Sequence, residues 1–150
     1  MQVPKLQDNA RYVKITSELR LHHKELLQLE QQGRLKEVKD SPLIGEYLTK
    51  LRLNVNLLFA FINNYLDVHS DLTVELAEKR QKLYIEQLEE GKTPSGAETH
   101  AKQITRVDEA TIKVVENQMQ QLKNEYERFN GICMMLQSRL REFNTERVMG

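Results

Sequence analysis

Residues 41–90 read SPLIGEYLTKLRLNVNLLFAFINNYLDVHSDLTVELAEKRQKLYIEQLEE and contain the longest regular pattern in the chain. One set of positions recurs there at alternating steps of three and four residues, as in a coiled-coil seam: Leu48, Leu51, Val55, Leu58, Ile62, Tyr65, His69, Leu72, Leu76, Lys79 and Leu83. Ser41 is a favourable N-cap, and Pro42 suits the first helical position. The pattern predicts one helix over about 42–90. Such a helix measures about 70 Å, which a globular core cannot cover, so it requires a partner helix.

A second seam supplies this partner. Its positions are Ile112, Val115, Met119, Leu122, Tyr126, Phe129, Cys133, Leu136, Leu140 and Phe143. Asp108 precedes them as a candidate N-cap. The second seam therefore predicts a helix over about 109–146.

The connection between the two seams is short. Residues 91–96 hold two glycines and one proline and predict a loop, and a short helix is expected over 97–106. Because so compact a link leaves no room for a parallel arrangement, the long helices should pack antiparallel. The expected neighbours are Leu83 with Ile112 and Leu51 with Phe143.

The N-terminal part of the chain predicts a third helix over 9–32, which Asp8 or Asn9 can cap and Gly33 can end. Residues 34–40 are polar and suit a linker or a short helical extension. Four apolar residues lie off the first seam: Leu57, Phe59, Phe61 and Leu66. We therefore expect one all-α domain over 1–150, a long antiparallel helical hairpin of coiled-coil type with an additional N-terminal helix. The extra apolar surface should serve packing of that helix or formation of a homo-oligomer.

Composition narrows the function. The 150 residues are 39% hydrophobic and 29% charged, without Trp, which is typical of long exposed helices rather than of a compact α/β enzyme. Twenty-two basic residues balance twenty-two acidic ones, which excludes a uniformly basic DNA-coating protein but allows local basic patches. Cys133 is the single cysteine, and the most apolar run, 55–62, is too short to span a bilayer. We expect a cytoplasmic protein without a membrane partner.

No sequence pattern is typical of a catalytic or metal site. The four histidines, His22, His23, His69 and His100, lack metal-ligand spacing relative to one another and to Cys133. The chain also lacks a phosphate-binding loop and a dinucleotide-binding glycine pattern. We therefore expect no catalytic residue, no metal and no cofactor. His69 and Lys79 interrupt their seam as polar residues that set its register, with pH sensing as the alternative for His69, and Cys133 is expected in the core.

Folding of the hairpin should gather basic residues at its two ends. At the loop end these are Lys79, Arg80, Lys82, Lys92, Lys102 and Arg106, with Tyr84 beside them to stack on a base. At the other end they are Lys50, Arg52, Arg139, Arg141 and Arg147. Either set suits a phosphate backbone. The alternative is an ordinary solvated helix face, because several glutamates lie at ion-pairing distance on the same helix as the first set: Glu75, Glu78, Glu86 and Glu89.

A family resemblance extends from Asn63 to Phe143. The run Tyr65-Leu66-Asp67-Val68-His69-Ser70 is followed by the basic cluster before Leu83-Tyr84, a glycine, a polar loop, an aspartate-started helix and a late Ser138-Arg139. In order and spacing these features resemble the phage recombination-mediator proteins of the UvsY type. The chain departs from that family in its first helix and in Leu140, which stands after Arg139 in place of a glycine.

This resemblance implies a small helical, ring-forming protein that binds single-stranded DNA. It also implies contact with the single-strand-binding protein and help in loading a RecA-like recombinase. The residues at the family's DNA-binding positions would be Lys79, Arg80 and Lys82, before Leu83-Tyr84.

Two hypotheses follow. The leading one is a non-enzymatic, oligomeric accessory protein of phage-type DNA recombination or replication, which binds single-stranded DNA and helps load a recombinase. Because each subunit has few basic residues, several subunits would engage one strand, and such avidity adds roughly two to four orders of magnitude to affinity. The alternative is a structural, adaptor or inhibitor protein that uses the hairpin for protein-protein interaction without binding DNA.

Overall fold

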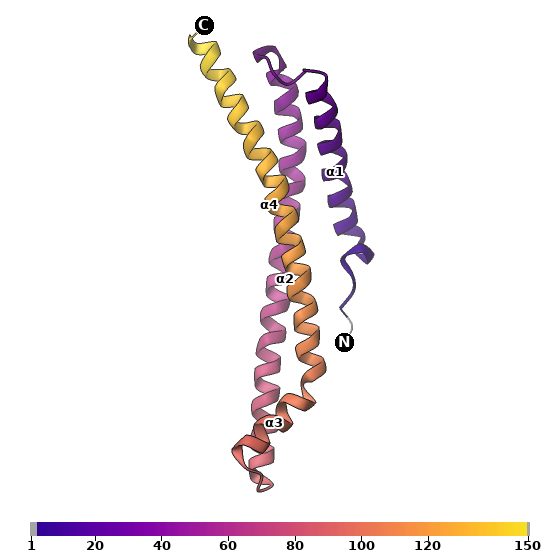
Figure 1. Ribbon diagram of the computed structural model, residues 1–150, viewed down its shortest axis with the longest axis vertical. Coiled ribbons are helices and arrows are strands. Elements are labelled where there is room, and N and C mark those ends of the chain that lie inside the picture. Colours follow the sequence, from indigo (N-terminus) through magenta and orange to yellow (C-terminus); the bar gives the residue numbers. More distant parts are fainter. Residues whose placement is uncertain (1–2, 150) are drawn as a thin grey trace. The chain divides into compact units, whose positions relative to one another are not determined.

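The computed structural model describes residues 3–149, and the regular structure in these residues is entirely helical (Figure 1). The α-helices are α1 (Ala10–Gln31), α2 (Ser41–Glu89), α3 (Pro94–Ile104) and α4 (Arg106–Met149), and two short 3-10 helices, η1 (Leu6–Asp8) and η2 (Val38–Asp40), precede α1 and α2. The all-α prediction is confirmed, with long helices α2 and α4 packed antiparallel and an additional N-terminal helix.

The chain divides into two compact units. The first, here called the α1 unit, comprises Lys5–Ile62 and Leu122–Gly150. The second, the α3 unit, comprises Asn63–Gln121 and the first residues of the chain up to Pro4. Each unit therefore contains one part of α2 and one part of α4.

In the α1 unit, local signals set the ends of α1 as the sequence predicts. The Asn9 side chain accepts a hydrogen bond from the Tyr12 backbone N–H at 3.1 Å, which caps the first turn. Gly33 follows the last turn with φ of +71°, a left-handed conformation that glycine adopts without steric cost. The Arg34 N–H then bonds the Leu29 carbonyl at 3.0 Å, which closes the helix end.

The core of the α1 unit lies between α1, α2 and α4. Its largest fully buried side chains are Leu19, Leu35, Ile44, Leu51, Val55, Leu58, Leu122, Phe129, Cys133 and Leu136. The prediction that Cys133 is a core residue is confirmed, and burial raises the pKa of its thiol. Leu35, which the sequence places in a polar linker, is buried as well.

Helix α1 is fastened to the other two helices of its unit by polar groups as well as by the core. The Tyr12 hydroxyl donates to Glu125 on α4 at 2.5 Å, and the Tyr47 hydroxyl on α2 donates to Glu25 at 2.6 Å. The His23 ring meets Phe129 edge-on, with 6.1 Å between the ring centroids. The N-terminal helix thus packs within its own chain.

The beginning of α2 differs from the prediction. The helix begins at Ser41, whose backbone is already helical, so Ser41 is not an N-cap. Its hydroxyl donates to the Val38 carbonyl at 2.6 Å, while the Asp40 carboxylate accepts the Glu37 N–H at 3.0 Å. The preceding 3-10 turn therefore takes over the capping role. The helix ends at Glu89, one residue before the expected end.

The connection between α2 and α4 is also shorter than predicted. Helix α3 begins at Pro94 rather than at Ala97, because the Thr93 side chain accepts the Gly96 N–H at 3.1 Å and proline fits the first helical position. The turn before it contains Gly91 with φ of +86°. The loop thus shrinks to the few residues before Thr93.

Helix α3 ends at Ile104, and Thr105 alone separates it from α4, which begins at Arg106 and continues to Met149. The predicted N-cap Asp108 lies inside the first turn of α4, so that prediction is wrong. Its carboxylate instead accepts from Lys79 Nζ at 2.9 Å. The carboxylate still suits this position, because a helix N-terminus favours negative charge.

The register of the hairpin differs from the prediction by about two helical turns. Ile112 lines a hollow with Leu72 and Leu76, not with the expected Leu83. In the α1 unit, Arg52 bonds Gln137, so the neighbouring Leu51 does not face Phe143 as expected. The physical reason is α3, which packs beside the last turns of α2 and lets α4 begin pairing only at Arg80.

Candidate nucleic-acid interface

The seven residues predicted to bind nucleic acid all belong to the α3 unit, but only some of them lie together. Arg80 and Tyr84 on α2 and Lys102 on α3 line one open groove of about 380 Å³. Gln81, Glu98 and Ala101 complete its walls. Ala101 is buried, and its small side chain lets α3 approach α2 closely enough to form the groove.

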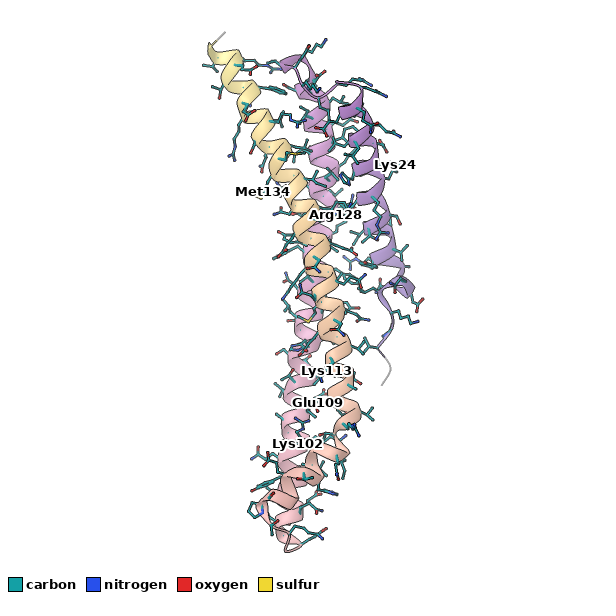
Figure 2. The ribbon with its side chains drawn as sticks, viewed as in Figure 1. Lys24, Lys102, Glu109, Lys113, Arg128 and Met134 are labelled. Atoms are coloured by element: carbon teal, nitrogen blue, oxygen red, sulfur yellow. The ribbon has the colours of Figure 1, made fainter. Side chains whose placement is uncertain are left out.

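Three of the predicted basic residues pair with carboxylates. Lys79 binds Asp108 at 2.9 Å, and Lys102 binds Glu98 one helical turn away at 3.1 Å. Arg80 donates from Nη2 to Glu109 at 3.1 Å. Figure 2 labels Lys102 and Glu109. The partners are carboxylates of α3 and α4 and not the four glutamates of α2 that the alternative named, but these pairs still reduce the positive field of the set.

Arg80 has a structural role in addition. Its Nε donates to the Thr105 hydroxyl at 2.9 Å, and Thr105 is fully buried at the junction between α3 and α4. The Thr105 hydroxyl in turn donates to the Ala101 carbonyl at 2.7 Å. Arg80 therefore holds the junction in place and forms a fixed wall of the groove.

The other three basic residues of this set are exposed, and none of them forms an ion pair within residues 3–149. Arg106 lines a shallow hollow beside the groove, together with Lys102 and Glu109. Lys82 and Lys92 do not line the groove. The structure thus brings together Arg80, Tyr84 and Lys102, with Arg106 adjoining them.

The second predicted set lies in the α1 unit, and most of its members serve local structure. Arg139 is half-buried and donates to Glu30 at 3.3 Å and to the Leu35 carbonyl at 3.4 Å. Lys50 pairs with Glu46 at 3.0 Å and lies over the Tyr47 ring. Arg147 donates to the Val38 carbonyl at 3.4 Å, whereas Arg141 is exposed.

Arg52 is held differently from the other arginines. Its guanidinium donates to the amide oxygens of Asn130 at 3.0 Å and Gln137 at 3.1 Å. A side-chain amide is neutral, so these bonds orient Arg52 without cancelling its charge. Neither amide is among the residues predicted from the sequence. The two are seven residues apart and so share one face of α4, and this spacing is the signal in the sequence that could have pointed to them.

The two units also differ in charge. Residues 63–121 carry seven Lys and Arg against eleven Asp and Glu, a net charge of −4. Residues 5–62 and 122–150 carry fifteen against eleven, a net charge of +4. The zero net charge of the whole chain therefore conceals an acidic α3 unit and a basic α1 unit.

The two polar positions of the first seam both bind carboxylates on α4. His69 Nε2 lies 3.0 Å from Glu116 Oε1, and Lys79 binds Asp108. Among the described residues, no cluster of three or more His, Cys, Asp or Glu side chains is placed to hold a metal ion. In the same part of the chain, no helix has the length and apolar character needed to cross a membrane.

Comparison of the chain with protein-family models, curated proteins and solved structures finds no match.

Proposed function

We propose that the chain is a non-enzymatic protein that binds single-stranded DNA in the groove between α2 and α3. The observation that carries this proposal is the presence of Tyr84 together with two cations, Arg80 and Lys102, in one open groove. Proteins that bind single strands without sequence preference combine basic grooves with aromatic side chains on which bases stack. Tyr84 would stack a base, and the two cations would contact the flanking phosphates.

The two cations of the groove would bind phosphate in different ways, because one of their ion pairs is easily replaced and the other is held by further bonds. Lys102 and Glu98 are each 63% exposed, and such surface pairs contribute less than about 1 kcal/mol. A phosphate can therefore replace Glu98 as the partner of Lys102. Arg80 keeps its bonds to Thr105 and Glu109 and would contact DNA without moving.

The place of this binding in the cell rests on the resemblance to phage recombination mediators. We propose that several copies of the chain engage one strand and help to load a RecA-like recombinase in the presence of the single-strand-binding protein. The acidic balance of the α3 unit makes the affinity of one copy low, so a homo-oligomer would supply the avidity.

The test is a fluorescence-anisotropy titration of a labelled single-stranded oligonucleotide at low and high salt. Tyr84→Leu should weaken binding about tenfold, since stacking contributes about 1 to 3 kcal/mol per base. Lys102→Ala should flatten the salt dependence by about one counterion.

Lys113→Ala is the matched control, because Lys113 is an exposed lysine of α4 in the same unit and does not line the groove (Figure 2). Lys113→Ala should change neither the affinity for the oligonucleotide nor the salt dependence of binding. If Lys113→Ala and Lys102→Ala have equal effects, or if Tyr84→Leu binds like the wild type, the groove is not the site. Absence of binding at every salt concentration would exclude the proposed function itself.

The second candidate function is an adaptor or scaffold that binds another protein through helix packing. It is favoured by large apolar side chains that remain in solvent, such as Leu53 at 62% and Val107 at 71% exposure. This function predicts no affinity for DNA. A light-scattering mass measurement of the chain with and without the oligonucleotide separates the two candidates.

A further inference from the structure

We infer that the α1 unit carries a second contact surface for single-stranded nucleic acid, built on Arg52 and Phe59 of α2 and Tyr126 of α4. This inference deepens the proposed function and rests on it, because it names a further place on the chain where single-stranded nucleic acid would bind. None of these three residues lines the groove between α2 and α3.

The aromatic part of this surface is a pair of rings. Phe59 is 49% exposed, although it is among the largest apolar side chains of the chain. The Tyr126 ring lies against it, with 5.6 Å between the centroids and 43° between the ring planes. Two adjacent rings offer an apolar platform of the kind on which bases stack.

Helix α1 does not cover this platform. In the same unit, α1 contacts Phe61 of α2 through Tyr12 and Phe129 of α4 through His23. Phe61 is two residues from Phe59 along α2, which is about 200° around the helix. Glu125, the other partner of Tyr12, directly precedes Tyr126 on α4. Phe59 therefore lies on the side of α2 that faces away from α1, and Tyr126 packs against it.

The polar residues that share a helix face with the rings include several cations and neutral amides. At helical steps along the same face, α2 presents Arg52, Asn56 and Phe59. The corresponding face of α4 presents Lys123, Tyr126, Asn130, Gln137 and Arg141. These eight positions hold three cations, and the carboxylate of Glu127 is exposed on α4 one helical turn from Lys123. In the groove between α2 and α3, by contrast, both cations are paired with glutamates.

This chemistry favours a nucleic acid over a second copy of the chain. Arg52 keeps its charge because its partners are amides, and Arg141 and Lys123 form no ion pair among the described residues. Two copies that met through this same unit would repel each other, because each unit carries a net charge of +4. A single strand supplies both requirements, phosphates for the cations and flat bases for the rings.

The test uses the full chain and an oligonucleotide containing 5-iodouracil, which crosslinks under ultraviolet light to aromatic side chains that stack on it. We expect crosslinked peptides containing Phe59 or Tyr126, mapped by mass spectrometry. Phe59→Leu should weaken binding in the anisotropy titration about tenfold, and Phe59→Tyr should restore it because the ring is kept. Since Phe59 is half exposed, Phe59→Leu should leave the thermal unfolding curve unchanged.

The outcomes separate this inference from the proposed function. If Tyr84→Leu weakens binding whereas Phe59→Leu does not, the surface on the α1 unit is excluded and the groove remains. If Phe59→Leu lowers the mass in light scattering and leaves DNA affinity intact, the face joins copies of the chain and the inference is overturned. If the wild type does not bind single-stranded DNA at low salt, both fail together.

Discussion

Among the described residues, nineteen buried apolar side chains belong to the α1 unit and six to the α3 unit. The seams of α2 and α4 run through both units without interruption, so the heptad spacing does not account for this difference. Helix α1 does, because it gives the α1 unit a third apolar layer. In the α3 unit, polar pairs between α2 and α4, such as Lys79 with Asp108 and His69 with Glu116, occupy positions that a core would fill.

One helical pattern therefore serves two purposes along its length. Where a third helix covers the pair, the seam becomes a core that determines stability. Where no third helix covers it, the same spacing leaves charged and aromatic side chains at the surface. We therefore expect the free energy of unfolding to depend mainly on the α1 unit and to be less sensitive to changes in the α3 unit.

The largest expected effect compares two leucines of the same seam. Leu58 is fully buried in the α1 unit, and Leu58→Ala should lower the free energy of unfolding by about 3 to 5 kcal/mol. Leu76, 9% exposed in the α3 unit, touches a hollow, so Leu76→Ala should cost about 2 kcal/mol. Urea denaturation followed by circular dichroism measures both. Equal losses would show that the two units contribute alike.

An intermediate effect on the free energy of unfolding is expected from the loss of polar contacts. Tyr47→Phe removes the hydrogen bond to Glu25 in the α1 unit and should cost about 1.5 kcal/mol, because its acceptor is a carboxylate. Lys79→Met removes the exposed pair with Asp108 in the α3 unit and should cost less than about 1 kcal/mol. If Lys79→Met lowers the free energy of unfolding more than Tyr47→Phe does, polar contacts of the α3 unit contribute more to stability than those of the α1 unit.

The same tyrosine gives a pH signature. The hydrogen bond to Glu25, followed by burial, raises the pKa of Tyr47 from 10.0 to about 12. Since the folded pKa is the higher one, this contribution to stability is complete below pH 10.0 and is lost as the pH rises through about 12. Phenolate absorbance should show Tyr47 titrating late beside Tyr65, whose pKa burial also raises, and Tyr47→Phe should remove one of these steps.

The smallest effect is expected from His23. Burial, followed by the nearby charge of Arg128, lowers the pKa of His23 below 6.5. The unfolded chain then binds the proton more readily, so this contribution is complete above pH 6.5 and is lost as the pH falls through the folded pKa. An NMR titration of the His23 ring should give the lowered pKa, and His23→Gln should make the acid side of the stability curve flatter.

Much of the fold follows from local patterns. The seams predict the long helices, and a compact link between them predicts their antiparallel packing. Asn9 and Gly33 act as predicted because their neighbours in the chain supply the capping bonds. Ser41 and Asp108 fail as predicted caps because a residue caps only if its own backbone is not helical. The turns that precede them decide that conformation.

The proposed binding surfaces are less predictable because they depend on the register of α2 and α4. A shift of about two turns changes which carboxylate faces which cation. Arg139, expected at a basic patch, bonds the α1–α2 connection, and Arg52 finds two amides. The sequence shows which residues are basic and which are aromatic. It does not show that Phe59 and Tyr126 are neighbours, since they belong to different helices.

The Asn130 amide that orients Arg52 is also relevant to the chemical stability of the protein. Asn130 is followed by Gly131, the dipeptide in which an asparagine most readily loses its amide group when the backbone is flexible. Both residues lie within α4, where helical hydrogen bonds restrain the backbone nitrogen that would attack the side chain. Deamidation would place a carboxylate about 3.0 Å from the Arg52 guanidinium and cancel the charge that the amide preserves. The integrity of this helix therefore protects the chemical identity of Asn130 as well as its position.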